Sequence, residues 1–301
     1  MSGGMGTRLR PLTCHLPKPM VPIFNKPNME YIIELLRDSG IEDIAITLHY
    51  LPEKIMDYFG KGEKFDVSLK YYIEDKPLGT GGSVKNTGEF LDSTFIVISG
   101  DAFTNIDIKK AWEFHKGKKS KATLVLKRED IPLEYGVVII DDNGKIIKFL
   151  EKPSWGEVFS DTINTGIYIL EPSVLDYYKI GEKFDFSKDL FPKLLEDNVP
   201  LYGYVMNEYW CDVGDYNSYL ETHKDVFLDP NKYYLLKQEG KEGIWVGENT
   251  LVEKGAEINP PVYIGDNTII KSGANIESYT VIGNKCTIGE NTSIKKSIIW
   301  D

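Results

Sequence analysis

The strongest constraint on the fold lies after residue 243, where a large apolar residue recurs every six positions. Helices and strands repeat about every 3.6 and 2 residues, so neither element explains this spacing. A six-residue repeat is typical of a parallel β-helix, in which each repeat forms one side of a triangular coil. Small residues stand where corners are expected, at Gly247, Gly265, Gly283 and Gly289. The apolar series comprises Val246, Val252, Ile258, Ile264, Ile270, Ile276, Ile282, Ile288, Ile294 and Trp300.

Residues 1–229 show a different pattern, in which strands alternate with helices. We predict strands over 43–50, 67–73, 94–99 and 122–127, and helices over 29–40, 52–60 and 107–115. This alternation favours a Rossmann-like α/β fold, with a mostly parallel sheet between layers of helices. The segment 135–152 predicts a hairpin that turns at Asp142-Asn143-Gly144, so the sheet should be mixed. We expect one domain over 1–229, a linker over 230–243 and the repeat domain over 244–301.

The composition narrows the class of partner. Lys and Arg number 35 against 46 Asp and Glu, which gives a net charge of −11 and argues against nucleic acid or a membrane surface as partner. The three cysteines, Cys14, Cys211 and Cys286, show neither zinc spacing nor a disulfide framework. Such cysteine usage fits a reducing cytoplasm, and the chain has no apolar run of about 20 residues.

A glycine-rich segment near the start carries the sharpest chemical signal. Gly3, Gly4 and Gly6 precede Thr7-Arg8-Leu9, and Pro17-Lys18-Pro19 follows. Glycines let backbone N–H groups approach an anion closely, and Arg and Lys supply positive charge. The segment lacks the Gly-Lys-Ser/Thr of a Walker A loop. It predicts a phosphate-binding loop, with a mobile basic N-terminus as the alternative.

A second signal is Asp101, which directly follows the strand predicted over 94–99. The carboxyl ends of strands are where α/β sheets place their ligands. A turn or helix-cap role remains the alternative for this single aspartate.

Together these segments resemble the sugar-1-phosphate nucleotidyltransferase family, and within it the mannose-1-phosphate guanylyltransferases. The likeness extends over essentially the whole chain and implies an α/β domain followed by a left-handed β-helix of hexapeptide repeats. It implies transfer of a nucleotidyl group from an NTP to a sugar-1-phosphate, with release of pyrophosphate. It also implies that Gly3, Gly4, Gly6 and Thr7 wrap the nucleotide phosphates, while Arg8 and Lys18 neutralise the departing pyrophosphate.

The resemblance assigns further residues to the nucleotide and the metal. Asp101 and Asp212 would bind Mg²⁺ through hard oxygen ligands. Gly79 and Thr80, in Leu78-Gly79-Thr80-Gly81-Gly82, would hold the base and ribose, with Glu74 at the base-reading position. A carboxylate only accepts hydrogen bonds, and guanine offers two adjacent donor groups, N1–H and N2–H₂. Glu74 therefore favours GTP.

The sugar side is matched by Gly136, Glu151-Lys152-Pro153 and Asn164-Thr165-Gly166. By resemblance, Lys152 meets the phosphate of the sugar-1-phosphate, whereas Glu151 and Asn164 bind its hydroxyls and Gly136 and Gly166 belong to the same pocket. GTP with mannose-1-phosphate is the favoured pair. UTP or dTTP with glucose-1-phosphate is the first alternative. A catalytically inert regulatory subunit of such an enzyme is the second, and a β-helix acyltransferase ranks below both.

Both ends depart from the family pattern. The glycine-rich loop normally follows an apolar strand, which is missing here because Met1-Ser2-Gly3-Gly4 opens the sequence. The repeat series also stops at Trp300-Asp301 without a polar cap. We therefore expect a sheet with two unpaired neighbouring strands and a truncated β-helix, and possible homo-oligomers through that helix.

Overall fold

The structure is a computed structural model, and it describes residues 1–301 apart from Gly3, Met5, Trp155, Glu157, Phe159, residues 231–238 and Glu242. The chain divides into two compact units. The first unit contains Met1–Val21 and Asn28–Asp212, and the second contains Pro22–Pro27 and Val213–Asp301. Each unit is described by itself.

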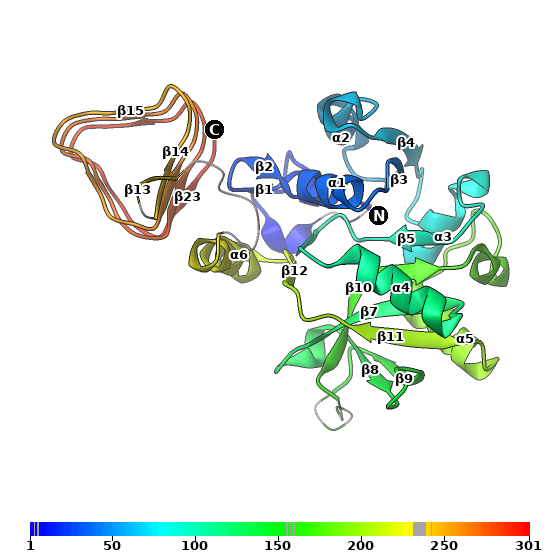
Figure 1. The fold of residues 1–301 in the computed structure, drawn as a ribbon. Helices are drawn as coiled ribbons and strands as arrows, with labels where there is room; N and C mark the ends of the chain where they lie inside the picture. The colour runs from blue at the N-terminus through cyan, green and yellow to red at the C-terminus, as the bar shows by residue number, and fades with distance from the viewer. Residues whose placement is uncertain are drawn as a thin grey trace. The chain divides into compact units, whose positions relative to one another are not determined.

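A mixed sheet forms the centre of the first unit (Figure 1). Its longest strand, β10 (Thr162–Leu170), runs antiparallel to three neighbours, β5 (Phe95–Val97), β7 (Ala122–Arg128) and β8 (Gly136–Ile140). Strand β11 (Leu201–Val205) pairs with β7 in parallel, and β9 (Ile146–Glu151) pairs with β8 antiparallel. The predicted mixed sheet is confirmed, although antiparallel pairs are more prominent than the strand–helix alternation indicated.

Alternating side chains on the strands make two apolar faces. On β7, Leu124 and Leu126 pack with α3 (Gly79–Lys85) and α5 (Phe191–Glu196), whereas Val125 packs with α1 (Asn28–Asp38) and α4 (Ile108–Lys118). The same alternation on β10 divides Tyr168 and Leu170 from Ile167 and Ile169. Helices therefore cover both faces of the sheet, as predicted. The N-cap of α4 is Asp107, whose carboxylate accepts a hydrogen bond from the Lys110 N–H.

Most local elements lie within two residues of their predicted bounds. The remaining strands of the first unit are β3 (Asp43–Leu48), β4 (Ser68–Ile73), β6 (Ala102–Thr104) and β12 (Trp210–Asp212), and the remaining α-helix is α2 (Pro52–Phe59). The predicted hairpin is β8–β9, and the Asp141 carboxylate accepts hydrogen bonds from the Asn143 and Lys145 N–H groups in its turn.

A cavity of about 560 Å³ lies between β3 and β5, lined mainly by apolar side chains of these strands and of α1. Met1 and Ser2 also line it. The Met1 ammonium donates to the Ile98 carbonyl at 2.9 Å, and the Ser2 N–H donates to the Thr47 carbonyl at 3.0 Å. Strand β3 pairs only with β4, and β5 only with β10, among the strands that the structure describes. Ser2 makes one parallel bridge to Leu48 of β3, and the expectation that a first strand is missing stays a prediction.

The second unit contains the predicted parallel β-helix, drawn as a three-sided coil in Figure 1. Each strand over 244–276 pairs in parallel with the strand 18 residues later, for example Ile264 with Ile282. The last pair, residues 281–282 with 298–299, is offset by 17 residues, so Ile299 packs against the apolar interior and the predicted position of Trp300 in the series is wrong. The apolar series fills the interior from Ile264 to Ile288 with no solvent-exposed member. Val252, which lies before this range, is the solvent-exposed member of the series, at 37% exposed. The strands are β14 (Ile244–Val246), β15 (Leu251–Val252), β16 (Glu257–Ile258), β17 (Val262–Ile264), β18 (Ile269–Ile270), β19 (Asn275–Ile276), β20 (Thr280–Ile282), β21 (Thr287–Ile288), β22 (Ser293–Ile294) and β23 (Ile298–Ile299).

Close approach between successive coils explains the corner glycines. A Cβ on Gly247 would lie 2.2 Å from Asp266 Oδ1, and a Cβ on Gly283 would lie 2.4 Å from Asp301 Oδ1. The same side chains form a ladder of hydrogen bonds along this corner, because Asp266 accepts from the Glu248 N–H and Asn284 accepts from the Asp266 N–H. Glycines therefore recur at this corner because a Cβ would clash with the next coil. Asx residues recur because their side chains accept hydrogen bonds from the preceding coil.

The second unit also holds a hairpin and a helix from outside the repeats. The hairpin consists of β1 (Pro22–Ile23) and β2 (Lys26–Pro27), and the helix is α6 (Tyr216–Leu228). The Phe24 ring packs against His223 and Phe227 of α6 and against Tyr263 of the β-helix. Aromatic contacts therefore join the hairpin, α6 and the coil into one core.

The predicted linker over 230–243 lies mostly outside the described residues. Within it the structure describes β13 (Glu239–Lys241), which pairs antiparallel with β14. The predicted boundary between the two domains stays a prediction, and the compact units divide earlier, after Asp212. No helix among the described residues is long and apolar enough to cross a membrane.

Candidate functional site

The described part of the glycine-rich loop turns sharply before a short 3-10 helix, Thr7–Leu9. Gly6 adopts φ +58°, and its carbonyl accepts a 2.7 Å hydrogen bond from the Thr13 hydroxyl. A Cβ at Gly6 would lie 3.0 Å from Thr13 Cγ2 and 3.1 Å from Lys18 Cβ. Both conformation and space therefore require glycine here. Gly4 is exposed with open space beside it, Thr7 is also exposed, and Gly3 lies outside the described residues.

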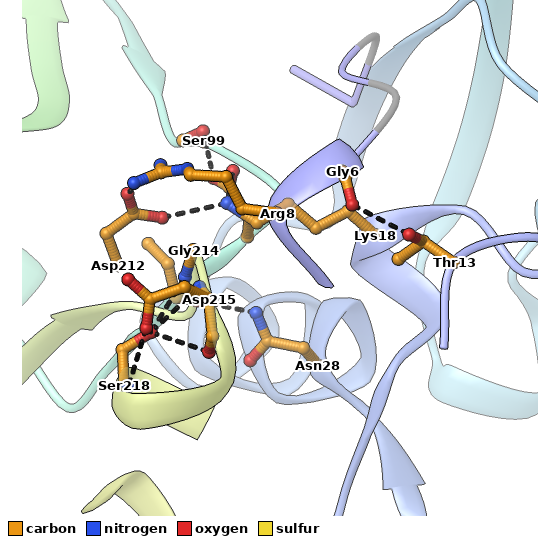
Figure 2. A network of polar contacts seen from close by, with 12 residues as sticks. Gly6, Arg8, Thr13, Lys18, Asn28, Ser99, Asp212, Gly214, Asp215 and Ser218 are labelled. Carbon is orange, nitrogen blue, oxygen red and sulfur yellow. Dashed lines mark hydrogen bonds and ion pairs between the residues drawn. The ribbon is translucent and has the colours of Figure 1, made fainter. Parts of the chain in front are cut away.

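Lys18 joins two carboxylates from distant parts of the first unit (Figure 2). Its Nζ donates to Asp101 Oδ2 at 2.5 Å and to Asp212 Oδ1 at 2.9 Å. The backbone explains why the aspartates meet, because Asp212 ends β12 and pairs with Ala102, the first residue of β6. Lys18 itself begins a 3-10 helix, Lys18–Met20, after Pro17. We call Lys18, Asp101 and Asp212 the carboxylate–lysine cluster.

Electrostatics divide the two carboxylates of this cluster. Burial would raise the pKa of Asp101, but the Lys18 ammonium and a hydrogen bond from Ser99 outweigh it and hold that pKa below its usual value. Burial and the charge of Asp101 raise the pKa of Asp212, against the opposing effects of Lys18 and Arg8. Burial would lower the pKa of Lys18, yet the two aspartates raise it overall. The lysine is therefore a permanent cation between them.

Arg8 lies beside the cluster and is more open to solvent. Its guanidinium is 3.9 Å from Asp212 Oδ2 and 3.6 Å from Glu134 Oε2, and its side chain is 57% exposed. A long exposed side chain at this position can move to meet an incoming anion.

Glu74, Gly79 and Thr80 surround the start of α3. Glu74 Oε2 accepts the Leu78 N–H at 3.1 Å, whereas Oε1 is buried without a hydrogen-bond partner among the described residues. Gly79 adopts φ +77°, and a Cβ there would lie 2.6 Å from the Phe184 carbonyl oxygen. The Thr80 hydroxyl donates to Asp185 Oδ2 at 3.0 Å and accepts the Phe186 N–H at 2.9 Å. These two hydrogen bonds hold residues 185 and 186 against the start of α3.

The residues predicted for the sugar gather around β8, β9 and β10. Gly136 is the register partner of Glu151, and a Cβ on Gly136 would lie 2.9 Å from Glu151 Oε2. Burial, and then the charge of Asp185, raise the pKa of Glu151. Lys152 takes φ +47° as β9 ends, and its N–H donates to the Tyr135 carbonyl at 3.1 Å.

Asn164 and Gly166 form a turn within β10. Asn164 Oδ1 accepts the Gly166 N–H at 3.1 Å, while its amide nitrogen donates to the Tyr168 and Ser187 hydroxyls. A Cβ on Gly166 would lie 3.7 Å from Ser99 Cβ. Because Ser99 donates to Asp101 Oδ1, Ser99 lies between Gly166 and the carboxylate–lysine cluster.

The predicted phosphate-loop, carboxylate and sugar-pocket residues that the structure describes thus lie in one compact unit. The family model for nucleotidyl transferases matches residues 1–227, which is most of the chain. This chain belongs to the nucleotidyl transferase family. The model for the bacterial transferase hexapeptide, six repeats, matches residues 243–278 of the β-helix.

Named relatives of this nucleotidyl transferase differ in substrate. It is 38% identical to the UTP–glucose-1-phosphate uridylyltransferase of Synechocystis, over 100% of this chain and 82% of the relative. It is 32% identical to the mannose-1-phosphate guanylyltransferase of Mycobacterium tuberculosis, over 86% of this chain and 75% of the relative.

Two similar solved structures likewise differ in the nucleotide named with them. A putative glucose-1-phosphate thymidylyltransferase from Bacillus anthracis, solved with sucrose, is 27% identical with a TM-score of 0.68 and covers 77% of this chain and 96% of its own. HddC from Yersinia pseudotuberculosis, solved with GMP-PN, is 31% identical with a TM-score of 0.64 and covers 75% and 96%.

The carboxylate–lysine cluster fits a hard divalent cation. Carboxylate oxygens are the ligands that Mg²⁺ prefers, and Mg²⁺ usually keeps several waters or substrate phosphates beside one or two carboxylates. No group of three or more His, Cys, Asp or Glu suited to a metal occurs among the described residues. This nucleotidyl transferase could therefore hold the ion through Asp101 and Asp212, with the other positions left to water and phosphate.

Sequence reasoning missed three polar residues of the site in this nucleotidyl transferase. Ser99 hydrogen-bonds Asp101, and Ser187 hydrogen-bonds Asn164. Asp185 accepts from Thr80 and from the Ser187 and Lys188 N–H groups as a helix N-cap. The Asp185-Phe186-Ser187 sequence carried a capping signal for the last of these.

Proposed function

We propose that this sugar-1-phosphate nucleotidyltransferase makes GDP-mannose and pyrophosphate from GTP and mannose-1-phosphate. The carboxylate–lysine cluster supports the chemistry most directly, because it places two carboxylates and a permanent ammonium together. Its lysine also lies next to Gly6 of the glycine-rich loop. A phosphate oxygen of the sugar-1-phosphate attacks the α-phosphorus of the NTP in line. The bond to the β-phosphate oxygen breaks, and pyrophosphate leaves.

Positioning and charge neutralisation carry most of such a transfer. Arg8 and Lys18 hold the departing pyrophosphate, with Gly3, Gly4, Gly6 and Thr7 presenting backbone N–H groups to the phosphates. Mg²⁺ held by Asp101 and Asp212 would supply Lewis-acid neutralisation of phosphate charge when bound. Lys152 orients the attacking phosphate, and its backbone leaves the strand conformation there, with φ +47°.

The sugar and base pockets complete the assignment. Glu151 and Asn164 bind sugar hydroxyls beside Gly136, where a Cβ would clash with Glu151, and beside Gly166. Gly79 and Thr80 shape the base and ribose side. Glu74 reads guanine, supported by its buried Oε1, which has accepting capacity to spare among the described residues.

A second candidate keeps the chemistry but uses UTP and glucose-1-phosphate. The relative that is 38% identical over the whole of this chain carries that activity in its name. Uracil presents two acceptors around a single N3–H, which suits an amide better than a carboxylate. The base preference therefore depends on Glu74.

The test is Glu74→Gln, with the exposed Glu89→Gln as a matched control. We expect the ratio of kcat/KM for GTP over UTP to fall by at least about tenfold in the first variant and to stay unchanged in the second. An unchanged ratio in Glu74→Gln would refute the base assignment. A wild-type preference for UTP would favour the second candidate.

A further inference from the structure

Three of the four oxygens of the Asp101–Asp212 pair accept a hydrogen bond, and the fourth forms only a longer ion pair. Lys18 takes one oxygen of each aspartate, Ser99 donates to Asp101 Oδ1, and Arg8 lies 3.9 Å from Asp212 Oδ2. Lys18 is the single donor among the described residues that bonds to both carboxylates. A divalent cation that binds Asp101 Oδ2 and Asp212 Oδ1 therefore has to take the place of the ammonium.

The two cations cannot share this position. Mg²⁺ binds carboxylate oxygens at about 2.0–2.1 Å. A lysine nitrogen that stayed 2.5 Å and 2.9 Å from the same two oxygens would touch the ion and repel it. The repulsion is weakly screened, because the Lys18 side chain is only 10% exposed.

Lys18 has a route out of the pair. Its backbone lies in the short helix after Pro17, and its four-carbon stem has rotatable bonds. The first carbon of the stem lies beside the glycine-rich loop, since a Cβ on Gly6 would be 3.1 Å from Lys18 Cβ. Rotation about the stem would carry the ammonium away from the aspartates and toward the loop.

We propose that Lys18 is an exchangeable internal counter-ion, which holds Asp101 and Asp212 together in the free protein and is displaced toward the phosphate loop when a divalent cation binds. Two properties follow. The free protein binds the cation weakly, because the ion competes with a covalently attached ammonium. Nucleotide strengthens cation binding, because its phosphates give the displaced lysine a new partner. The inference rests on the proposed cation site and needs no particular base or sugar.

The first test measures Mn²⁺ binding to the protein without nucleotide, from the electron paramagnetic resonance signal of free Mn²⁺. Lys18→Met keeps the length of the side chain and removes its charge. We expect Mn²⁺ to bind Lys18→Met at least about tenfold more tightly than the wild type. Arg8→Met is the matched control: it also removes one positive charge next to Asp212, but an exposed one, and we expect less than about a threefold change.

Equal or weaker Mn²⁺ binding by Lys18→Met would overturn the proposal, because it would make the lysine an organiser of the site instead of a competitor. That result would leave the proposed function standing, since pyrophosphate release by the wild type tests the function separately. Equal gains in Lys18→Met and Arg8→Met would also overturn it, because net charge alone would then explain the effect.

A second measurement uses the wild type and does not depend on the folding of a variant. Amine-directed labelling followed by mass spectrometry reports how accessible Lys18 is. We expect slow labelling of the free protein, faster labelling with saturating Mn²⁺, and renewed protection when GTP is added. Labelling of Lys18 that does not change with Mn²⁺ would contradict displacement. The exposed Lys110, which pairs with Asp107, serves as the internal reference.

Discussion

Lowering the pH from 7 to 5 should destabilise the second unit, because His223 is buried there as a neutral imidazole. The side chain is 3% exposed. Its Nε2 accepts the Phe24 N–H at 3.0 Å, so the proton is on Nδ1, which donates to the Tyr219 carbonyl at 2.8 Å. Burial lowers the pKa of His223 to about 4, from 6.5 in the unfolded chain.

The sign follows from which state takes up the proton. Between pH 6.5 and 4 the unfolded chain protonates this histidine and the folded chain does not, so stability falls as the pH falls through this window. The shift corresponds to a loss of about 2 kcal/mol of unfolding free energy between pH 7 and 5, and of about 3 kcal/mol by pH 4.

The assay is urea unfolding at pH 7, 6 and 5, followed by tryptophan fluorescence, since Trp245 is buried in the same unit. His223→Gln cannot titrate, so the wild type should lose about 2 kcal/mol more than this variant between pH 7 and 5. Carboxylates common to both proteins cancel in that difference. His115→Gln is the control, because burial also lowers the pKa of His115. This substitution leaves the His223 contribution in place. Equal losses in wild type and His223→Gln would refute the reasoning.

Three further predictions concern the first unit. Asp101→Asn removes a carboxylate that Lys18 and Ser99 both contact, and we expect kcat to fall by about 10²–10³-fold with an unchanged circular dichroism spectrum; near-normal turnover would contradict its role. Lys152→Asn keeps a residue that tolerates φ +47° and removes the charge, so kcat should fall steeply while the melting temperature stays within a few degrees; normal kcat would remove Lys152 from the phosphate site. An apolar segment of about six residues joined ahead of Met1 should fill the cavity between β3 and β5 and raise the urea midpoint, whereas a Gly/Ser segment of equal length should not. Equal midpoints for the two extensions would show that this cavity does not accept a strand.

Periodicity in the sequence predicted local elements better than it predicted their partners. The six-residue series marked successive coils because one apolar residue per repeat must point inward, and Ile264, Ile270 and Ile276 are fully buried. The β-rich run over 122–127 similarly predicted β7. The central position of β10 was not predicted, because its pairing with β5, β7 and β8 depends on contacts between segments far apart in the chain.

The candidate site shows the same division. The family resemblance predicted Asp101 and Asp212 as metal ligands, and the pairing of β6 with β12 brings them together. The sequence assigned Lys18 to the departing phosphates, whereas in the structure its ammonium lies between the two aspartates. Side-chain contacts of this kind have no sequence period, so they become visible only in three dimensions. The same is true of Phe24, whose hairpin lies beside α6 and the β-helix core.

The most direct test of the central claim is pyrophosphate release by the purified chain with Mg²⁺ and a panel of four NTPs against four sugar-1-phosphates. The account predicts release that requires both substrates and is greatest with GTP and mannose-1-phosphate. Release greatest with UTP or dTTP and glucose-1-phosphate would keep the transfer chemistry and contradict the assigned base and sugar. A folded chain that released no pyrophosphate with any pair would contradict the claim and favour an inert regulatory subunit.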